Sequence, residues 1–153
     1  MKYSETIKEE LLKKCQQWVE EKITTARTAM NFAQEAANSE EKSSAGDKYE
    51  TGRAMAQNER DQAAQQLEEA LVWKKVLDQI DIHHHPLKPV LGSLVFTDKQ
   101  VFFLSISAGK LVVDHQEYLA VSVQSPVGKL LRETSKGQSF TINKQVYTVV
   151  DVK

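Results

Sequence analysis

The sequence predicts an α+β protein in which two long helices precede a small antiparallel sheet with one short helix. Apolar residues recur every three or four positions through residues 4–80, which is the period of a helix. At Val90 the pattern changes to the alternation that is typical of strands. Pro86 and Pro89 mark the change, because proline ends a helix and stiffens the chain around it.

The composition is that of a globular protein without a membrane span. Of the 153 residues, 41% are hydrophobic, and 20 Lys and Arg residues stand against 21 Asp and Glu residues. This balance gives no reason to expect electrostatic binding to nucleic acid or to a membrane. No apolar run approaches the ~20 residues of a membrane span, and the charged N-terminus does not resemble a signal peptide. We expect a cytoplasmic protein, and the single cysteine, Cys15, agrees with a reducing compartment.

The first helix is predicted over residues 4–38. Its apolar stripe begins with bulky residues, among them Leu11 and Trp18, and fades to alanines such as Ala33 and Ala37. Small residues on such a stripe let two helices approach closely. Cys15 lies within the stripe, so we expect it to pack as a small hydrophobic residue and not to act as a reactive thiol.

The second helix is predicted over residues 47–80, after a polar turn at residues 38–46. Apolar residues recur every seven positions along one side of this helix, at Tyr49, Ala56, Ala63, Ala70 and Leu77. A sustained heptad seam is typical of a coiled coil, and the short turn makes the first helix its nearest, antiparallel partner. The predicted hairpin, residues 1–82, would be about 50 Å long at ~1.5 Å per residue.

A linker, residues 83–89, is predicted to join the hairpin to a C-terminal domain, residues 90–153. Three adjacent histidines, His83, His84 and His85, could be interpreted as metal ligands. Consecutive side chains converge on one ion only where the backbone folds for it, so we prefer a polar hinge.

The C-terminal domain is predicted to be an antiparallel sheet with one short helix. Ser125 followed by Pro126 indicates the start of that helix, because serine is a good N-cap and proline favours the first helical position. Residues 98–99 and 143–144 indicate hairpin turns. The strands are expected at residues 91–97, 101–107, 110–113, 118–123, 139–142 and 146–152.

Asp47 and Glu50 are the candidate functional side chains of the hairpin. They lie three positions apart at the predicted start of the second helix, so their carboxylates share one face at the tip. The same spacing suits a capping box, with Asp47 as the cap and Glu50 at the third helical position. Mg²⁺ prefers oxygen ligands and commonly takes only one or two protein carboxylates. Both roles stay open, and they can coexist.

Two stretches resemble the bacterial transcript-cleavage factors of the GreA/GreB family. The first, Gly46-Asp47-Lys48-Tyr49-Glu50, is similar to the Gly-Asp-x-x-Glu at the coiled-coil tip of those factors. The second covers essentially the whole C-terminal domain and follows the order of the family. Its parts are the opening Gly92-Ser93, the helix start Ser125-Pro126, the turn Gly137-Gln138 and the closing strand 147–152.

The resemblance implies an FKBP-like C-terminal domain and a role in transcription elongation. In that family the C-terminal domain docks on RNA polymerase, which here would involve Gln124, Ser125 and Pro126. The coiled coil enters the secondary channel, where Asp47 and Glu50 would be the catalytic pair. They would help to hold a Mg²⁺ shared with the polymerase and would contact the RNA 3′ end transiently. We expect a monomer without stand-alone activity, which stimulates the polymerase's own cleavage of backtracked RNA.

An alternative is a non-catalytic regulator that binds RNA polymerase and occludes or modulates the channel. The sequence departs from the family directly after Glu50, where Thr51-Gly52-Arg53 replaces the usual run. A stand-alone enzyme has no support, because the sequence offers no nucleophile–base pair, no phosphate loop and no closed set of metal ligands.

Overall fold

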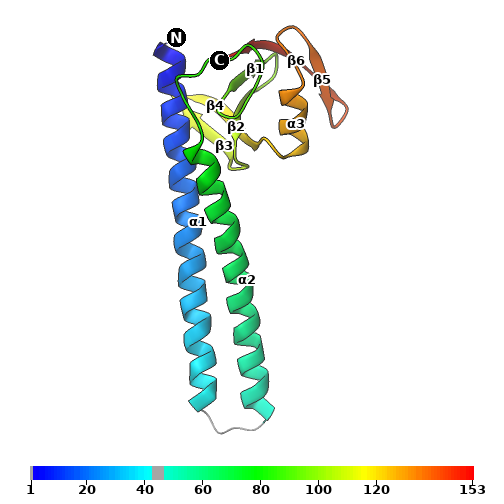
Figure 1. Cartoon of the computed structure of the whole chain (residues 1–153). Coiled ribbons are helices and arrows are strands. Elements are labelled where there is room, and N and C mark those ends of the chain that lie inside the picture. The colour runs from blue at the N-terminus through cyan, green and yellow to red at the C-terminus, as the bar shows by residue number, and fades with distance from the viewer. Residues whose placement is uncertain (1, 43–46) are drawn as a thin grey trace. The chain divides into compact units, whose positions relative to one another are not determined.

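The protein has an α+β architecture in the computed structural model, with two long helices followed by a mixed six-stranded sheet and a short helix (Figure 1). The structure describes residues 2–42 and 47–153, without the side chains of residue 2 and residues 40–50. The helices are α1 (Lys2–Lys42), α2 (Asp47–Asp78) and α3 (Pro126–Arg132). The strands are β1 (Leu94–Thr97), β2 (Val101–Ser105), β3 (Gly109–Val113), β4 (Gln116–Ser122), β5 (Ser139–Ile142) and β6 (Gln145–Val152).

The chain forms two compact units, each of which contains parts of both long helices. One unit joins Met1–Gln17 to Lys75–Lys153, so it holds the start of α1, the end of α2 and the whole sheet. The other unit is Trp18–Lys74. No helix in the described part of the chain has an apolar stretch that could cross a membrane.

Helix α1 continues further than the sequence predicts. The polar turn was expected to start at residue 38, but the helix runs to Lys42. The rest of that predicted turn, residues 43–46, lies outside the described residues. Helix α2 begins at Asp47, as the sequence predicts, and ends at Asp78.

The sheet is mixed, with the strand order β3-β4-β2-β1-β6-β5. The prediction of an antiparallel sheet is wrong in one pairing, because β2 and β4 run parallel, with Phe102 opposite Leu119. The other pairings are antiparallel. The parallel pairing arises because β3 takes the edge position, and the tight turn after β3 returns β4 into the space beside β2. Periodicity predicts that these segments are strands, but it does not predict their neighbours.

Two-residue turns close both terminal hairpins of the sheet. Asn143 and Lys144 have φ values of 49° and 68° and join β5 to β6, which confirms the predicted turn. Asp114 and His115, with φ values of 51° and 66°, form the corresponding turn between β3 and β4. Positive φ at both central residues matches the twist of antiparallel strands, and Asn and Asp tolerate it better than most residues.

Strand β1 begins three residues later than predicted, because Gly92 adopts a conformation that does not belong to a strand. Its φ is +93°, and a Cβ at this position would lie 2.9 Å from Cγ2 of Ile80. The Gly92 N–H donates a hydrogen bond of 2.7 Å to the Leu104 carbonyl. Glycine alone combines this backbone conformation with so close an approach.

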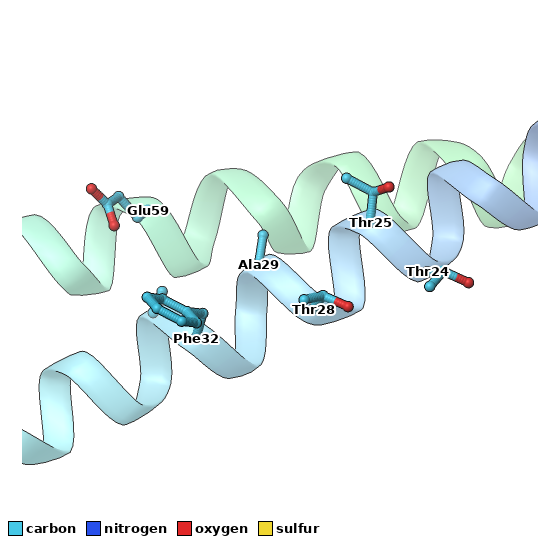
Figure 2. A pocket seen from close by; sticks show the side chains of 7 residues that line it. Thr24, Thr25, Thr28, Ala29, Phe32 and Glu59 are labelled. Carbon is cyan, nitrogen blue, oxygen red and sulfur yellow. The ribbon is translucent and has the colours of Figure 1, made fainter.

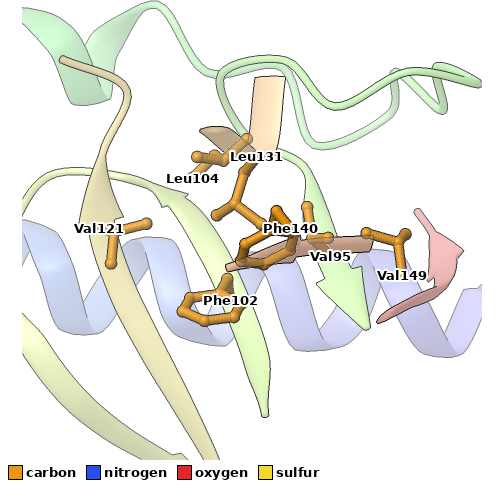
Figure 3. Packing of buried hydrophobic residues seen from close by; sticks show 7 residues of the cluster. All are labelled: Val95, Phe102, Leu104, Val121, Leu131, Phe140 and Val149. Carbon is orange, nitrogen blue, oxygen red and sulfur yellow. The ribbon is translucent and has the colours of Figure 1, made fainter. Parts of the chain in front are cut away.

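The hydrophobic core of the sheet lies between its strands and α3. Phe102 meets the Phe140 ring edge-on, with ring centroids 6.4 Å apart. Strand β2 is buried at every position, so both of its faces are covered. Phe103 is therefore also buried, on the face that carries Ser105, whose hydroxyl lies 3.8 Å from the Cys15 sulfur of α1. The core cluster is Val95, Phe102, Leu104, Val121, Leu131, Phe140 and Val149 (Figure 3).

Candidate functional site

Asp47 and Glu50 occupy the first turn of α2. Asp47 is the first residue of the helix, and Glu50 follows three positions later. The N-terminus of a helix stabilises negative charge, so the local structure suits two acids. The side chains of both residues, and with them the predicted carboxylate pair and its metal site, lie outside the described part of the structure.

Side-chain contacts join α1 and α2 within residues 18–74. The Trp18 and Trp73 rings have centroids 5.3 Å apart, and Lys74 Nζ lies 2.9 Å from Glu20 Oε1. Further along, Arg60 donates a hydrogen bond of 3.0 Å to Gln34 Oε1. The partner in α2 moves to lower residue numbers as the position in α1 rises. Buried alanines line both helices here, at Ala26, Ala33, Ala37, Ala56, Ala63 and Ala70.

The second predicted site, Gln124-Ser125-Pro126, is a hydrogen-bonded loop before α3. Ser125 is the N-cap of α3, and its hydroxyl accepts from the Gly128 N–H at 3.0 Å and donates to the Ser122 carbonyl at 2.7 Å. The Gln124 N–H donates to the Ser122 hydroxyl at 3.1 Å. Gln124 and Pro126 are exposed, and Ser125 is half-buried. The predicted helix start is therefore confirmed. The exposed residues Gln124 and Pro126 lie on a loop that is fixed by these hydrogen bonds.

The histidine-rich segment after α2 folds against the start of α1. Glu5 Oε1 lies 3.1 Å from His85 Nε2 and 3.6 Å from His83 Nδ1. The hydrogen bond from His85 is the largest of the effects that lower the pKa of the Glu5 carboxyl. In the part of the chain that the structure describes, no group of three or more His, Cys, Asp or Glu side chains could hold a metal ion.

Two ionisable groups are buried in the same compact unit. Lys8 has no exposed surface, and its ammonium donates a hydrogen bond of 3.1 Å to the His84 carbonyl. Burial lowers the pKa of Lys8, while the charges of Asp81 and Glu5 act in the opposite direction. Burial also raises the pKa of the Cys15 thiol to about 11. Cys15 is thus a packed residue, as the sequence indicates, because a thiolate is disfavoured there.

Two neighbouring cavities between α1 and α2 were not predicted. One, of about 580 Å³, is lined by Thr24, Thr25, Thr28, Ala29, Phe32, Ala33 and Glu59 (Figure 2). The other, of about 300 Å³, is lined by Trp18, Lys22, Thr25, Gln66, Glu69 and Trp73. A signal was present in the sequence, because Trp18, Lys22, Thr25, Ala29 and Phe32 follow each other at alternating spacings of four and three. Lys22 and Thr25 make this stripe less apolar than the neighbouring stripe of α1, so the periodic pattern of the sequence does not reveal it.

No protein-family model matches the chain, and no curated protein matches it.

Proposed function

We propose that the protein is an RNA polymerase-binding transcription elongation factor of the GreA/GreB type. In this proposal residues 1–82 form an antiparallel coiled-coil hairpin, and residues 90–153 form an FKBP-like docking domain. The observation that carries the proposal is the position of Asp47 and Glu50 in the first turn of α2, directly after the connection between two long helices.

The coiled-coil part is supported by the contacts within residues 18–74. From the Trp18–Trp73 contact to the Gln34–Arg60 contact, the residue number rises in α1 and falls in α2. An antiparallel hairpin requires this pattern. Buried alanines on both helices suit close packing over this segment. A slender pair of helices is a suitable form for entry into a narrow channel.

The docking part is supported by the loop before α3. A partner surface binds best to groups that are already held in place, because less conformational freedom is lost on binding. The backbone around Ser125 meets this condition through its hydrogen bonds to Ser122 and Gly128. Gln124 and Pro126 are the exposed residues that would contact the polymerase.

The chemistry of the two acids fits a shared Mg²⁺ site. Two carboxylates supply too few ligands for a complete site, but Mg²⁺ commonly takes one or two of them and fills the rest with water and phosphate oxygens. Asp47 and Glu50 would be these ligands, and the polymerase and its RNA would supply the others. The ion would activate water for hydrolysis of the RNA 3′ end. The isolated protein would have no activity, and the polymerase would act with it in the cytoplasm.

A cleavage assay on backtracked elongation complexes of the host polymerase tests the proposal. The wild-type protein should release short 3′ RNA fragments, and Asp47→Asn with Glu50→Gln should abolish release while polymerase binding survives. Glu68→Gln, an exposed acid further along α2, is the matched control and should cleave normally. Equal cleavage by the double variant would refute the catalytic assignment, and failure of the wild type to bind polymerase would refute the proposal as a whole.

A non-catalytic regulator that occludes the channel is the second candidate. It is favoured by the position of both acids in the first turn of α2, where the helix N-terminus stabilises negative charge without a metal ion. This candidate predicts polymerase binding and altered pausing or initiation, with RNA cleavage no faster than that of the polymerase alone. In that case the double variant would change the stability of α2 and leave regulation intact.

A further inference from the structure

The two cavities between α1 and α2 share one lining residue. Thr25 lines both the smaller cavity at Trp18 and Trp73 and the larger one at Phe32 and Glu59. All of these residues belong to the compact unit Trp18–Lys74. We call this surface the interhelical groove, defined by Trp18, Lys22, Thr25, Ala29 and Phe32 on α1 and by Glu59, Gln66, Glu69 and Trp73 on α2.

The groove has the length and spacing of a helix-packing surface. Its α1 wall is a stripe with spacings of four, three, four and three, which is the repeat that one helix presents to another. From residue 18 to residue 32 this wall is about 21 Å long, or ~4 turns. Beyond Trp18, which contacts Trp73 of α2, the residues of this stripe are exposed.

Aromatic rings with exposed surface line the groove. The Phe32 side chain is 76% exposed, and Figure 2 shows it on α1 with Glu59 on the neighbouring α2. Trp18 and Trp73 are only half-buried, although their rings contact each other. A ring that stays in water does not gain the favourable free energy of burying its apolar surface. In protein interfaces, a few residues of this kind supply most of the binding free energy.

The charges on the two walls differ. The α2 wall carries Glu59 and Glu69, both exposed and about 15 Å apart at ~1.5 Å per residue. Neither makes an ion pair with another residue in the described ranges. On the α1 wall, Lys22 Nζ lies 5.2 Å from the Trp18 ring centroid, so the aromatic end of the groove already holds a cation.

We propose that the interhelical groove binds one amphipathic helix of a partner protein, about four turns long. The apolar face of that helix packs on Trp18, Phe32 and Trp73, and a row of Lys or Arg side chains on its flank faces Glu59 and Glu69. Packing of a third helix into the groove between two others completes a three-helix arrangement. The proposal does not rest on the proposed function.

Two synthetic peptides of about four to five turns serve as probes. Both carry the same leucine stripe, and one has lysines where the other has glutamates on the flank. Trp18 and Trp73 are the 2 tryptophans of the chain, and both line the groove, so tryptophan fluorescence reports binding directly. The full-length protein should give a saturable spectral change with the lysine peptide. Binding of the glutamate peptide should be weaker by at least ~10-fold, which corresponds to about 1.4 kcal/mol.

Variants locate the binding. Phe32→Ala should weaken binding of the lysine peptide by ~10-fold or more, because it removes the exposed aromatic contact. Glu59→Lys with Glu69→Lys should reverse the preference between the two peptides. Met55→Ala is the matched control, since Met55 is an apolar residue of α2 that is 59% exposed and does not line the groove. It should bind both peptides as the wild type does.

Three results would overturn the proposal. The first is the absence of any fluorescence change with the lysine peptide at about 1 mM, the weakest affinity considered. The second is equal binding of the two peptides, which would remove the role of the acidic wall. The third is a dimer of this chain that Phe32→Ala dissociates, since the groove would then be a contact between copies. Far-ultraviolet circular dichroism of each variant ensures that lost binding is not lost helix.

Discussion

The ammonium of Lys8 donates a hydrogen bond to the backbone carbonyl of His84, 76 positions away in the sequence, at a distance of 3.1 Å. Lys8 has no exposed surface, although lysine is almost never fully buried in folded proteins. The bond ties the start of α1 to the histidine-rich segment after α2, within one compact unit.

Lys8 should make the stability of the protein rise with pH above neutrality. Burial holds its pKa below the ordinary 10.5, so between that lowered value and 10.5 the unfolded chain binds more protons than the folded one. The free energy of unfolding therefore increases as pH rises through this interval. Lys8→Met should flatten the increase in urea titrations between neutral pH and pH ~10.5, whereas Lys14→Met, at an exposed position of α1, should preserve it. An equal slope in both variants would contradict the assignment.

Glu5 should titrate below its ordinary pKa of 4.5, mainly because His85 donates a hydrogen bond to its carboxylate. A lowered pKa in the folded state means that Glu5 contributes stability above pH 4.5, and that this contribution is lost as pH falls through the lowered value. Carbon NMR of the Glu5 carboxyl measures the shift. His85→Gln should move the pKa back up, and His84→Gln, whose side chain makes none of these contacts with Glu5, should leave it unchanged. No difference between the two variants would show that His85 is not the cause.

The Cys15 thiol should resist alkylation in the folded protein. Burial raises its pKa to about 11, and only the thiolate reacts at an appreciable rate. At about pH 8, iodoacetamide should modify the unfolded chain readily, because an exposed cysteine has a pKa of ~8.5. Mass spectrometry with and without denaturant measures the protection. Rapid modification without denaturant would mean that the start of α1 separates easily from β2.

Gly128 should not tolerate a methyl group. A Cβ there would overlap the Ser122 carbonyl oxygen and lie 2.9 Å from Cα of Val123. We expect Gly128→Ala to destabilise the protein by about 2–3 kcal/mol, although alanine alone favours a helix. Gly137→Ala is the comparison, because a Cβ there meets nothing within 4 Å and strains only the backbone at φ +88°, which costs about 1–2 kcal/mol. Equal losses in urea unfolding would mean that the loop before α3 adapts to the added methyl.

Local signals in the sequence predict the elements well and their neighbours poorly. Ser125 and Pro126 predict the start of α3, because capping depends on adjacent residues. The parallel pairing of β2 with β4 depends on which strand occupies the sheet edge, and no local pattern encodes this. The contact of Glu5 with His83 and His85 was missed for the same reason, since nearly the whole helical part of the chain separates them.

In the candidate sites too, the features that depend on adjacent residues were predicted and those that depend on distant residues were not. The start of α2 at Asp47 follows from its local pattern, and the structure agrees. The interhelical groove escaped prediction because polar Lys22 and Thr25 interrupt its stripe, and a periodic pattern does not reveal which apolar residues remain in water. The 76% exposure of Phe32 is visible only once both helices are present.

The position of β6 bears on how the chain matures on the ribosome. Strand β6 is translated after the other five, yet it lies between β1 and β5, and it is the strand with which β5 pairs. A nascent chain that ends before residue 145 therefore leaves the outer edge of β1 open to strands of other molecules. Closure of that edge must wait until β6 has emerged, and until then the unpaired edge of β1 can associate with strands of other molecules.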